Sequence, residues 1–335
     1  MRLLQNSIYS ALLSALILFT ITCAQNPKAS TDKLVLVLNK NEATMTIFDA
    51  DSMTALGKVG VGDGPHEVVT SQDGKTAFVA KYGGRTPGSS ISVNDLKSMK
   101  ETRRVDLSPL IRAHGIQEIN GKIYFSAEAS RAIARYDPTT NKVDWIMGTG
   151  QNASHMVVGS SDEKRFYTAN IASNSVTMFE LQAAPPSGSK ITQIPVGNQP
   201  EAIDLSPDGK EVWVGLNSEA KVEVIDTTQK KAVKKIDVGA RPYRVKFTPD
   251  GKYVFATLIF GKKEIVVIDA KTHEVTRRIL MESEAWGIIF SKDSKFAFVT
   301  AARDNLVYKI DLEKFEVVGK AETGSVPDGI ALTGM

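Results

Sequence analysis

Three features of the sequence predict an all-β fold, a seven-bladed β-propeller of four-stranded blades. A unit anchored on a proline or a small residue recurs at intervals of 41 to 48 residues, which is a typical period for one propeller blade. Each unit holds short β-branched and aromatic runs separated by Asp-Gly or Asn-Gly turns, as strands do. The two ends of the chain supply complementary parts of one unit, so the ring can close.

The composition is that of an ordinary globular protein. The chain has 335 residues, 42% of them hydrophobic and 24% charged, which excludes a disordered, collagen-like or polytopic membrane protein. The 41 Lys and Arg residues nearly balance the 38 Asp and Glu residues, so no nucleic-acid partner is expected. A single cysteine excludes an internal disulfide framework, a cysteine-rich zinc site and a CxxCH haem attachment.

The N-terminus predicts export. Arg2 precedes an apolar stretch at residues 8–21, which is too short to span a bilayer, and a polar run follows it. A lone cysteine at the end of such a stretch, Cys23, resembles a bacterial lipoprotein signal, which implies that Cys23 is acylated. We expect a signal peptide at residues 1–22, a flexible tether at 23–32 and the propeller at 33–335.

Two interpretations of this segment stay open. The lipoprotein pattern has Leu three positions before the cysteine and a small residue just before it, whereas this chain has Thr20 and Thr22 there. Ordinary signal cleavage after Ala24 is the alternative. Lipidation predicts a cell-envelope protein, at the outer membrane or facing the periplasm, whose membrane contact is the lipid anchor only; ordinary cleavage predicts a secreted or periplasmic protein.

Seven copies of the repeated unit share one register. Their anchors are Pro65, Ala113, Ser154, Pro200, Pro242, Ala285 and Pro327. Three positions after each anchor lies an aliphatic residue: Val68, Ile116, Val157, Ile203, Val245, Ile288 and Ile330. The clearest copies repeat Val-Gly-x-x-Pro at 196–200 and 238–242, followed by Pro-Asp-Gly-Lys at 207–210 and 249–252.

Each unit is expected to form four strands in order. The first follows the anchor, and a strongly apolar second strand comes next, for example at 77–80, 166–169 and 296–299. The third ends in an acid in every copy: Asp49, Asp95, Asp137, Glu180, Asp226, Asp269 and Asp311. One acid per unit just before a turn indicates turn capping rather than a site. The fourth strand is polar, as at 274–280.

The ends of the chain predict how the ring closes. The chain starts with strands two to four of a unit, at 34–38, 44–48 and 55–59, and the C-terminus supplies the missing first strand at 328–332. Pairing them in one blade removes the open edges of the ring. These repeats resemble the YVTN family of bacterial propellers over about residues 33–335. The resemblance implies the propeller fold but says little about chemistry; we expect a monomer.

One ring of residues is the candidate site. The residues directly after the anchors should surround the mouth of the central channel; they are His66, His114, His155, Glu201, Tyr243, Trp286 and Asp328, with Arg244 next to Tyr243. The ends of the second strands add Asn39, Lys81, Glu128, Asn170 and Asn217. Three of the four histidines share this register on successive blades.

Three interpretations of the ring remain. His66, His114 and His155 could bind a transition metal such as Zn, Cu, Fe or Ni, since imidazole suits these ions. Alternatively the ring binds a small anionic or polyhydroxylated ligand, or a protein, with His, Arg244 and Lys81 as donors and aromatic stacking surfaces. In the third interpretation the imidazoles only bond to neighbouring backbone.

The sequence identifies no catalytic residue, and we expect a binding module. The enzyme alternative is a metal-dependent hydrolase or oxidoreductase using the same mouth. Propeller lactonases have a similar size, but an acid pair of Glu201 and Asp328 would lie three blades apart. His273 stands apart and is expected to be exposed on an outer strand. The Gly- and Pro-rich loop at 81–90 is either a lid or a surface insertion, and 182–190 is a spacer.

Overall fold

The structure is a computed structural model that describes residues 33–182 and 189–334. The predicted signal peptide, the tether with Cys23 and most of the 182–190 spacer therefore lie outside the described residues. Within the described part, no helix combines the length and hydrophobicity needed to cross a membrane.

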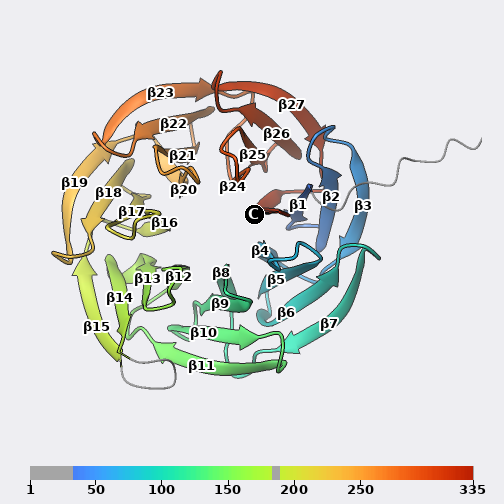
Figure 1. The fold of residues 1–335 in the computed structure, drawn as a ribbon, viewed down its shortest axis with the longest axis horizontal. Coiled ribbons are helices and arrows are strands. Elements are labelled where there is room, and N and C mark those ends of the chain that lie inside the picture. The colour runs from blue at the N-terminus through green and yellow to red at the C-terminus, as the bar shows by residue number, and fades with distance from the viewer. Residues whose placement is uncertain (1–32, 183–188, 335) are drawn as a thin grey trace, which may run out of the picture.

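Seven four-stranded antiparallel sheets surround a central axis, which confirms the predicted all-β, seven-bladed propeller (Figure 1). We number the blades by their anchors: blade 1 is β4–β7, blade 2 β8–β11, blade 3 β12–β15, blade 4 β16–β19, blade 5 β20–β23, blade 6 β24–β27, and blade 7 β28 with β1–β3. The inner strands are β4 (Pro65–Thr70), β8 (Ala113–Ile119), β12 (Ser154–Gly159), β16 (Pro200–Leu205), β20 (Arg241–Phe247), β24 (Ile288–Phe290) and β28 (Pro327–Leu332).

The remaining strands follow in the same order outward. The second strands are β5 (Thr76–Gly83), β9 (Lys122–Ala127), β13 (Arg165–Asn170), β17 (Glu211–Leu216), β21 (Tyr253–Ile259), β25 (Phe296–Ala301) and β1 (Leu34–Asn39). The third strands are β6 (Pro87–Asp95), β10 (Ala132–Asp137), β14 (Ser175–Leu181), β18 (Lys221–Asp226), β22 (Glu264–Asp269), β26 (Leu306–Asp311) and β2 (Thr44–Asp49). The outer strands are β7 (Lys100–Asp106), β11 (Lys142–Gly148), β15 (Ser189–Pro195), β19 (Lys231–Asp237), β23 (Glu274–Leu280), β27 (Glu316–Glu322) and β3 (Ala55–Gly60). A 3₁₀ turn, η1 (Ile171–Ser173), joins β13 and β14.

Blade 7 closes the ring as the sequence predicts. The C-terminal strand β28 pairs antiparallel with β1, with Val35 opposite Leu332 and Val37 opposite Ile330. Thr333 accepts a hydrogen bond from the Leu34 N–H at 2.7 Å. In Figure 1 the red C-terminal strand accordingly lies beside the blue N-terminal strands. Each blade is thus joined to its neighbours, and the ring has no free end.

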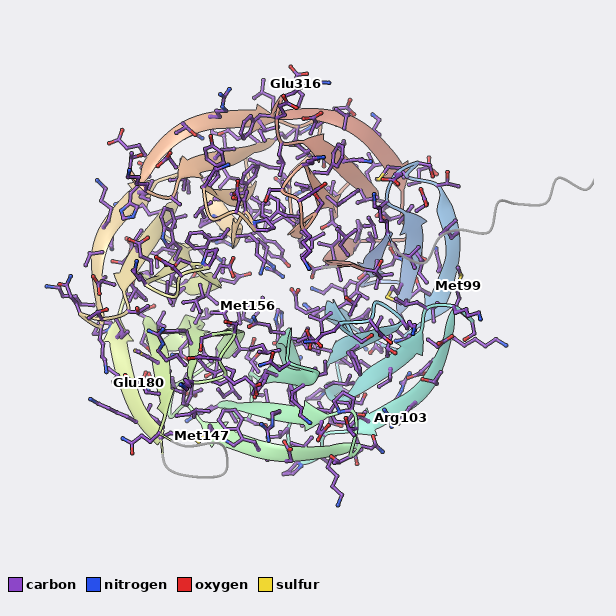
Figure 2. The ribbon with its side chains drawn as sticks, in the orientation of Figure 1. Met99, Arg103, Met147, Met156, Glu180 and Glu316 are labelled. Atoms are coloured by element: carbon purple, nitrogen blue, oxygen red, sulfur yellow. The ribbon has the colours of Figure 1, made fainter. Side chains whose placement is uncertain are left out.

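The core lies between the blades rather than at one centre. The described residues form seven hydrophobic clusters, and each cluster joins two adjacent blades. Blades 1 and 2, for example, share Phe78 and Phe125, and blades 5 and 6 share Phe255 and Phe290. Strands two and three are buried on both faces, which explains their nearly continuous apolar sequences. In Figure 2 Met156 lies near the axis, whereas Met99, Arg103, Met147, Glu180 and Glu316 lie further out.

The acids that end the third strands cap turns, as predicted, in six of the seven blades. Each of these six aspartates accepts hydrogen bonds from backbone N–H groups two or three residues ahead: Asp49, Asp95, Asp137, Asp226, Asp269 and Asp311. Glu180 differs, because its carboxylate pairs with Lys230 at 2.5 Å. The repeated acid therefore serves the fold and not a ligand.

Candidate functional site

The residues directly after the anchors lie where the inner strands are irregular. In six of the seven blades the pairing of the inner strand with its neighbour shifts register here, for example between Pro65 and Glu67 and between Pro200 and Ile203. A β-bulge bends a strand and redirects its side chain. The bulges thus turn one side chain per blade toward the channel. These side chains lie at the end of the channel where the β1–β2 hairpin turns, with Asn39 opposite Thr44.

These seven side chains form one continuous chain of contacts, which we call the mouth. Successive contacts are the Trp286 and Tyr243 rings at 4.7 Å, Tyr243 Oη to Asp328 Oδ1 at 2.6 Å, Asp328 Oδ2 to His66 Nδ1 at 3.5 Å, the His66 and His114 rings at 4.7 Å, the His114 and His155 rings at 3.8 Å, and His155 Nε2 to Glu201 Oε1 at 3.9 Å. The structure therefore brings together all the residues predicted to line the mouth.

Two of the stacked imidazoles are buried and hold little charge. His66 is 8% and His114 is 2% exposed. Burial lowers the pKa of His66 to about 3, against the opposing effect of Asp328. Burial, and then the neighbouring His155, lower the pKa of His114 well below its usual range. Both rings are therefore neutral at physiological pH and act as hydrogen-bonding groups rather than as cations.

Asp328 is the buried anion of the mouth. It is fully buried and accepts a hydrogen bond from Tyr243, while Lys40 Nζ lies 3.5 Å away and Arg244 Nη2 3.9 Å away. Burial opposes its charge, but Lys40 and Arg244 hold the pKa of Asp328 below its usual value. Burial and this carboxylate together raise the pKa of Tyr243 well above its normal range. Tyr243 is thus a fixed donor.

His155 lies between two carboxylates. Its Nδ1 is 2.5 Å from Glu128 Oε2, and its Nε2 faces Glu201. Glu201 in turn accepts a hydrogen bond from the side chain of Asn217. Burial alone would raise the pKa of Glu128, but the hydrogen bonds from His155 and Tyr82 lower it. An imidazole oriented by a carboxylate is an arrangement that can also accept or deliver a proton.

The 81–90 segment is an extension of the blade and not a free lid. β5 and β6 continue into it, with Lys81 opposite Ser90. It supplies Tyr82, whose hydroxyl donates to Glu128 at 2.8 Å and whose ring lies 4.8 Å from that of His66. Burial and the Glu128 bond raise the pKa of Tyr82 to about 12. The insertion therefore covers part of the mouth with a fixed aromatic side chain.

The other polar residues expected around the ring divide into two groups. Glu128 and Asn217 join the mouth. Asn39 and Asn170 instead bond to hydroxyl groups of their own blades, as with Asn39 Nδ2 to Thr46 at 2.8 Å and Asn170 Nδ2 to Thr177 at 2.9 Å. The Lys81 side chain instead lies beside Gly62 and Arg104, and burial together with the charge of Arg104 lowers the pKa of Lys81.

The expectation for His273 was wrong. It lies in the turn between β22 and β23 and is half-buried, with its Nε2 3.0 Å from Glu211 Oε1. Its ring packs edge-on against Trp213 at 5.2 Å. His273 therefore links blades 4 and 5, a contact between neighbouring blades that the position of one histidine in the sequence does not reveal.

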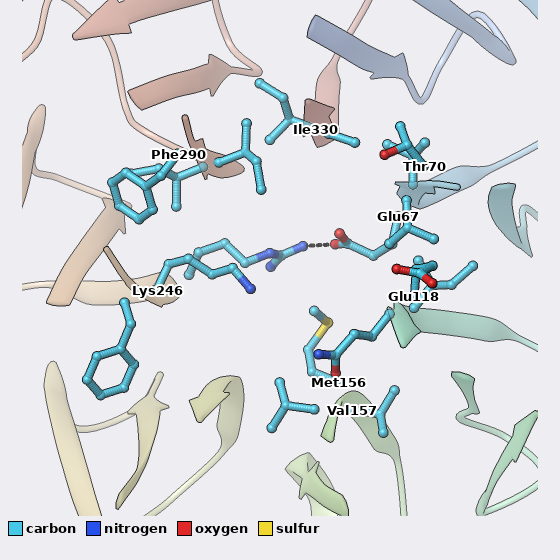
Figure 3. Close-up of a pocket in the computed structure, with 18 of the residues that line it drawn as sticks. Glu67, Thr70, Glu118, Met156, Val157, Lys246, Phe290 and Ile330 are labelled. Carbon is cyan, nitrogen blue, oxygen red and sulfur yellow. Dashed lines mark hydrogen bonds and ion pairs between the residues drawn. The ribbon is translucent and has the colours of Figure 1, made fainter. Parts of the chain in front are cut away.

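An ion pair that spans the channel was missed in the sequence. Two positions after the anchors, Glu67 of blade 1 and Arg244 of blade 5 bond across the axis (Figure 3). The other five blades carry Gly115, Met156, Ala202, Gly287 and Gly329 at this position. Burial opposes the charge of Arg244, but Glu67 and Asp328 raise its pKa. In the sequence, the signal for this ion pair was that only two blades carry a charged residue two positions after the anchor, and that the two charges are opposite.

On the side of this ion pair that faces away from the mouth lies a cavity of about 300 Å³, which we call the aliphatic chamber. All seven aliphatic residues three positions after the anchors line it, Val68 through Ile330. Its lining runs from Glu67 and Arg244 to Ser71 and Pro249 in the turns at the other end of the inner strands. The channel is therefore divided in two, and the cavity lies on the opposite side from the mouth.

The metal interpretation finds no ligand set. Among residues 33–182 and 189–334 no group of three or more His, Cys, Asp or Glu side chains is arranged to hold a metal ion. The histidine rings lie 3.8 to 4.7 Å apart and are tilted by 35° and 50°. Partly stacked rings present their faces to one another, whereas a shared ion needs their nitrogen lone pairs to converge.

The mouth contains buried polar atoms that nothing in the described chain satisfies. They are His66 Nδ1, which lies 3.5 Å from Asp328 Oδ2 but makes no hydrogen bond, His114 Nδ1, Asn217 Oδ1 and Trp286 Nε1. An unsatisfied buried donor or acceptor costs about 1–3 kcal/mol, so such atoms are normally paired with water or a ligand. Four of the eight such atoms in the described chain thus belong to the mouth, whereas the other four, on Arg103, Tyr167, Ser189 and Tyr308, are spread over blades 1, 3 and 6.

Comparison with known proteins agrees with the fold. A family model described as a YNCE-like beta-propeller matches residues 123–248, from β9 to the end of β20. The chain is a β-propeller protein. It is 28% identical to Antigen Lp49 of Leptospira interrogans over 159 residues, which cover 41% of this chain and 34% of that protein. The matched region thus spans about a third of that relative's length.

Solved structures show the same architecture at low identity. A functionally unknown protein from Desulfotomaculum acetoxidans is 12% identical with a TM-score of 0.76, covering 90% of this chain and 98% of its own. A Bacteroides uniformis protein provisionally described as a 6-phosphogluconolactonase is 12% identical with a TM-score of 0.74, covering 90% and 100%. At such identity these similarities concern the fold alone.

Proposed function

We propose that the protein is a binding module that takes a small polyhydroxylated ligand at the mouth. The observation that carries this proposal is the cluster of unsatisfied buried atoms on His66, His114, Asn217 and Trp286. These are neutral donors and acceptors, which suit hydroxyl groups. The Trp286 and Tyr243 rings add an apolar surface of the kind on which sugar rings stack.

The charges at the mouth argue against an anionic ligand. Asp328, Glu128 and Glu201 contribute three carboxylates, whereas His66 is neutral and Lys40 already pairs with Asp328 at 3.5 Å. The guanidinium of Arg244 already pairs with Glu67. A neutral ligand rich in hydroxyl groups therefore fits better than a phosphate or a carboxylate, which the sequence had left as an equal alternative.

Titration of tryptophan fluorescence tests this proposal. We expect saturable changes with at least one member of a panel of neutral sugars and polyols, including glucose, maltose, trehalose and myo-inositol. Trp286→Phe should remove the signal, and His114→Phe should weaken binding at least tenfold, whereas Trp145→Phe, altered in a blade interface, should leave the affinity unchanged. Failure of the whole panel, or binding that survives His114→Phe, would overturn the proposal.

A second function is favoured by the Glu128 and His155 pair. Because a carboxylate orients the imidazole at 2.5 Å, His155 could act as a general base in lactone hydrolysis. Hydrolysis of glucono-δ-lactone should then exceed the uncatalysed rate and fall at least a hundredfold in His155→Gln. Equal rates with and without the protein would eliminate this candidate.

We also propose that acylated Cys23 anchors the propeller in the cell envelope. The described chain starts at Lys33 and enters β1, whose first residue Leu34 lies at the chamber end of the ring and whose last residue Asn39 lies at the mouth end. A tether upstream of Lys33 would therefore join the ring at its chamber end. Cys23→Ala should move the protein from the membrane to the soluble fraction; retention of Cys23→Ala in the membrane fraction would contradict the anchor.

A further inference from the structure

The aliphatic chamber has the features of a binding site, although it is not part of the site proposed at the mouth. Its wall carries one β-branched aliphatic side chain from each of the seven blades, and Met156 and Phe290 add to it (Figure 3). Its volume of about 300 Å³ is at the lower end of the range for small-molecule sites. Water in such a space leaves apolar surface hydrated, so an apolar ligand would gain hydrophobic free energy.

The chamber has a closed end and an open end. The Glu67 and Arg244 ion pair crosses the channel at the end toward the mouth, as the dashed line in Figure 3 shows. At the other end its lining reaches polar residues at the end of β4 and in the turn after it, such as Thr70 and Gln72. A ligand must therefore enter from the turn side, with its apolar part inward and its polar group left at the rim.

The charged groups of the rim are not equally satisfied. Lys246 Nζ lies 3.4 Å from Asp204 Oδ1, so this cation already has a partner. Glu118 accepts one hydrogen bond, from the Gly121 N–H to Oε1 at 2.6 Å. Its other carboxylate oxygen has no hydrogen bond or ion pair with any residue that the structure describes. Burial, and the charge of nearby Glu163, raise the pKa of Glu118.

The surroundings of Glu118 are acidic. It also lines a neighbouring cavity of about 550 Å³ together with Asp162, Asp204 and Asp208, where Arg165 is the single cation. A positively charged group at the rim would pair with Glu118, whereas a carboxylate there would be repelled. The charge of the rim thus selects the polar group of the ligand.

We propose that the aliphatic chamber binds a small amphipathic amine, with its hydrocarbon body inside the ring of seven aliphatic side chains and its ammonium group at Glu118. This site lies on the opposite side of the ion pair from the mouth and is independent of the sugar site proposed there.

Calorimetric titration with a series of primary alkylamines at pH 7 tests this site. From n-butylamine to n-octylamine, the dissociation constant should fall about fourfold for each added methylene, the factor that corresponds to about 0.8 kcal/mol per buried CH₂. n-Octylamine should bind at least tenfold more tightly than n-octanoate, because only the amine can pair with Glu118.

Two variants locate the ligand. Glu118→Gln keeps the acceptor for the Gly121 N–H and removes the charge, so octylamine should lose at least tenfold in affinity. Met156→Trp should weaken the whole series by filling the chamber. Glu219→Gln, which removes one carboxylate from the turn between β17 and β18, and His114→Phe should leave octylamine binding unchanged; these controls separate the chamber from the mouth.

Three results would overturn the proposal. The first is that octylamine shows no saturable binding, which would mean that the chamber holds only water. The second is that octanoate binds as tightly as octylamine, and the third is that Glu118→Gln binds octylamine as tightly as the unaltered protein. Cooperative thermal unfolding of each variant shows whether it is folded, and Glu118→Gln decides the proposal even if Met156→Trp does not fold.

Discussion

The mouth and the aliphatic chamber are built by the same seven blades, two positions apart in the repeat, yet they differ in chemistry. At the chamber every blade contributes Val or Ile. At the mouth the blades contribute three histidines, two acids, a tyrosine and a tryptophan. Positions that all blades share serve the repeated packing, whereas positions that differ from blade to blade can build one asymmetric site. The variation within the repeat, more than the repeat, therefore indicates where specificity lies.

The largest effect should come from breaking the ion pair that separates the two regions. Arg244→Met leaves the carboxylates of Glu67 and Asp328 without their buried cation. Removing one partner of a buried pair costs about 3–5 kcal/mol, so chemical denaturation should show a loss of that size. The double variant Glu67→Gln/Arg244→Met should be less destabilised; a loss below about 1 kcal/mol in Arg244→Met would show that the pair has no such role.

One matched pair of substitutions compares the chamber with a blade interface directly. Met178 is 1% exposed between blades 3 and 4, whereas Met156 is half-buried and lines the chamber. Met178→Ala should cost about 2–5 kcal/mol, because it removes buried methylenes and creates a cavity. Met156→Ala only enlarges an existing space and should cost less than half as much. Equal losses in urea unfolding would mean that the chamber is packed as tightly as the interfaces.

The two buried histidines of the mouth should make stability depend on pH. His66 and His114 have folded-state pKa values below the unfolded value of about 6.5, with that of His66 near 3. Below pH 6.5 the unfolded chain therefore binds more protons, and the stability present above pH 6.5 is lost as the pH falls toward 3.

Between pH 7 and pH 5 this loss should amount to about 1–2 kcal/mol for each of the two histidines. His66→Phe/His114→Phe should remove that part of the pH dependence, measured as the difference in unfolding free energy between the two pH values. An unchanged difference in the double variant would show that these rings titrate normally.

The smallest effect is expected at a position that nearly all blades share. Asp226 accepts backbone hydrogen bonds from Thr228 and Gln229 at 2.8 and 2.7 Å. Asp226→Ala should cost about 1 kcal/mol, seen as a small decrease in melting temperature, whereas Asp226→Asn keeps an acceptor and should cost less. Ligand binding at the mouth or the chamber should not change in either variant.

Much of the architecture could be predicted from local patterns in the sequence. The spacing of the anchors, the turn residues after each inner strand and the complementary chain ends predicted seven blades and their closure, because a repeated blade packs against its neighbours in the same way each time. The mouth ring followed from one register position. Its three histidines and Asp328 were therefore assigned to one place without any coordinates.

The blade count, the closing blade and the register of the mouth could thus be predicted from the chain's repeats, since each depends on the period of one chain segment. Three features became visible only in the folded ring: Glu67 meets Arg244 across the axis, Tyr82 covers His66, and the cavity lies on the far side of the ion pair. These depend on how side chains from distant blades reach one another once the ring has closed, and no repeat within the sequence encodes that geometry.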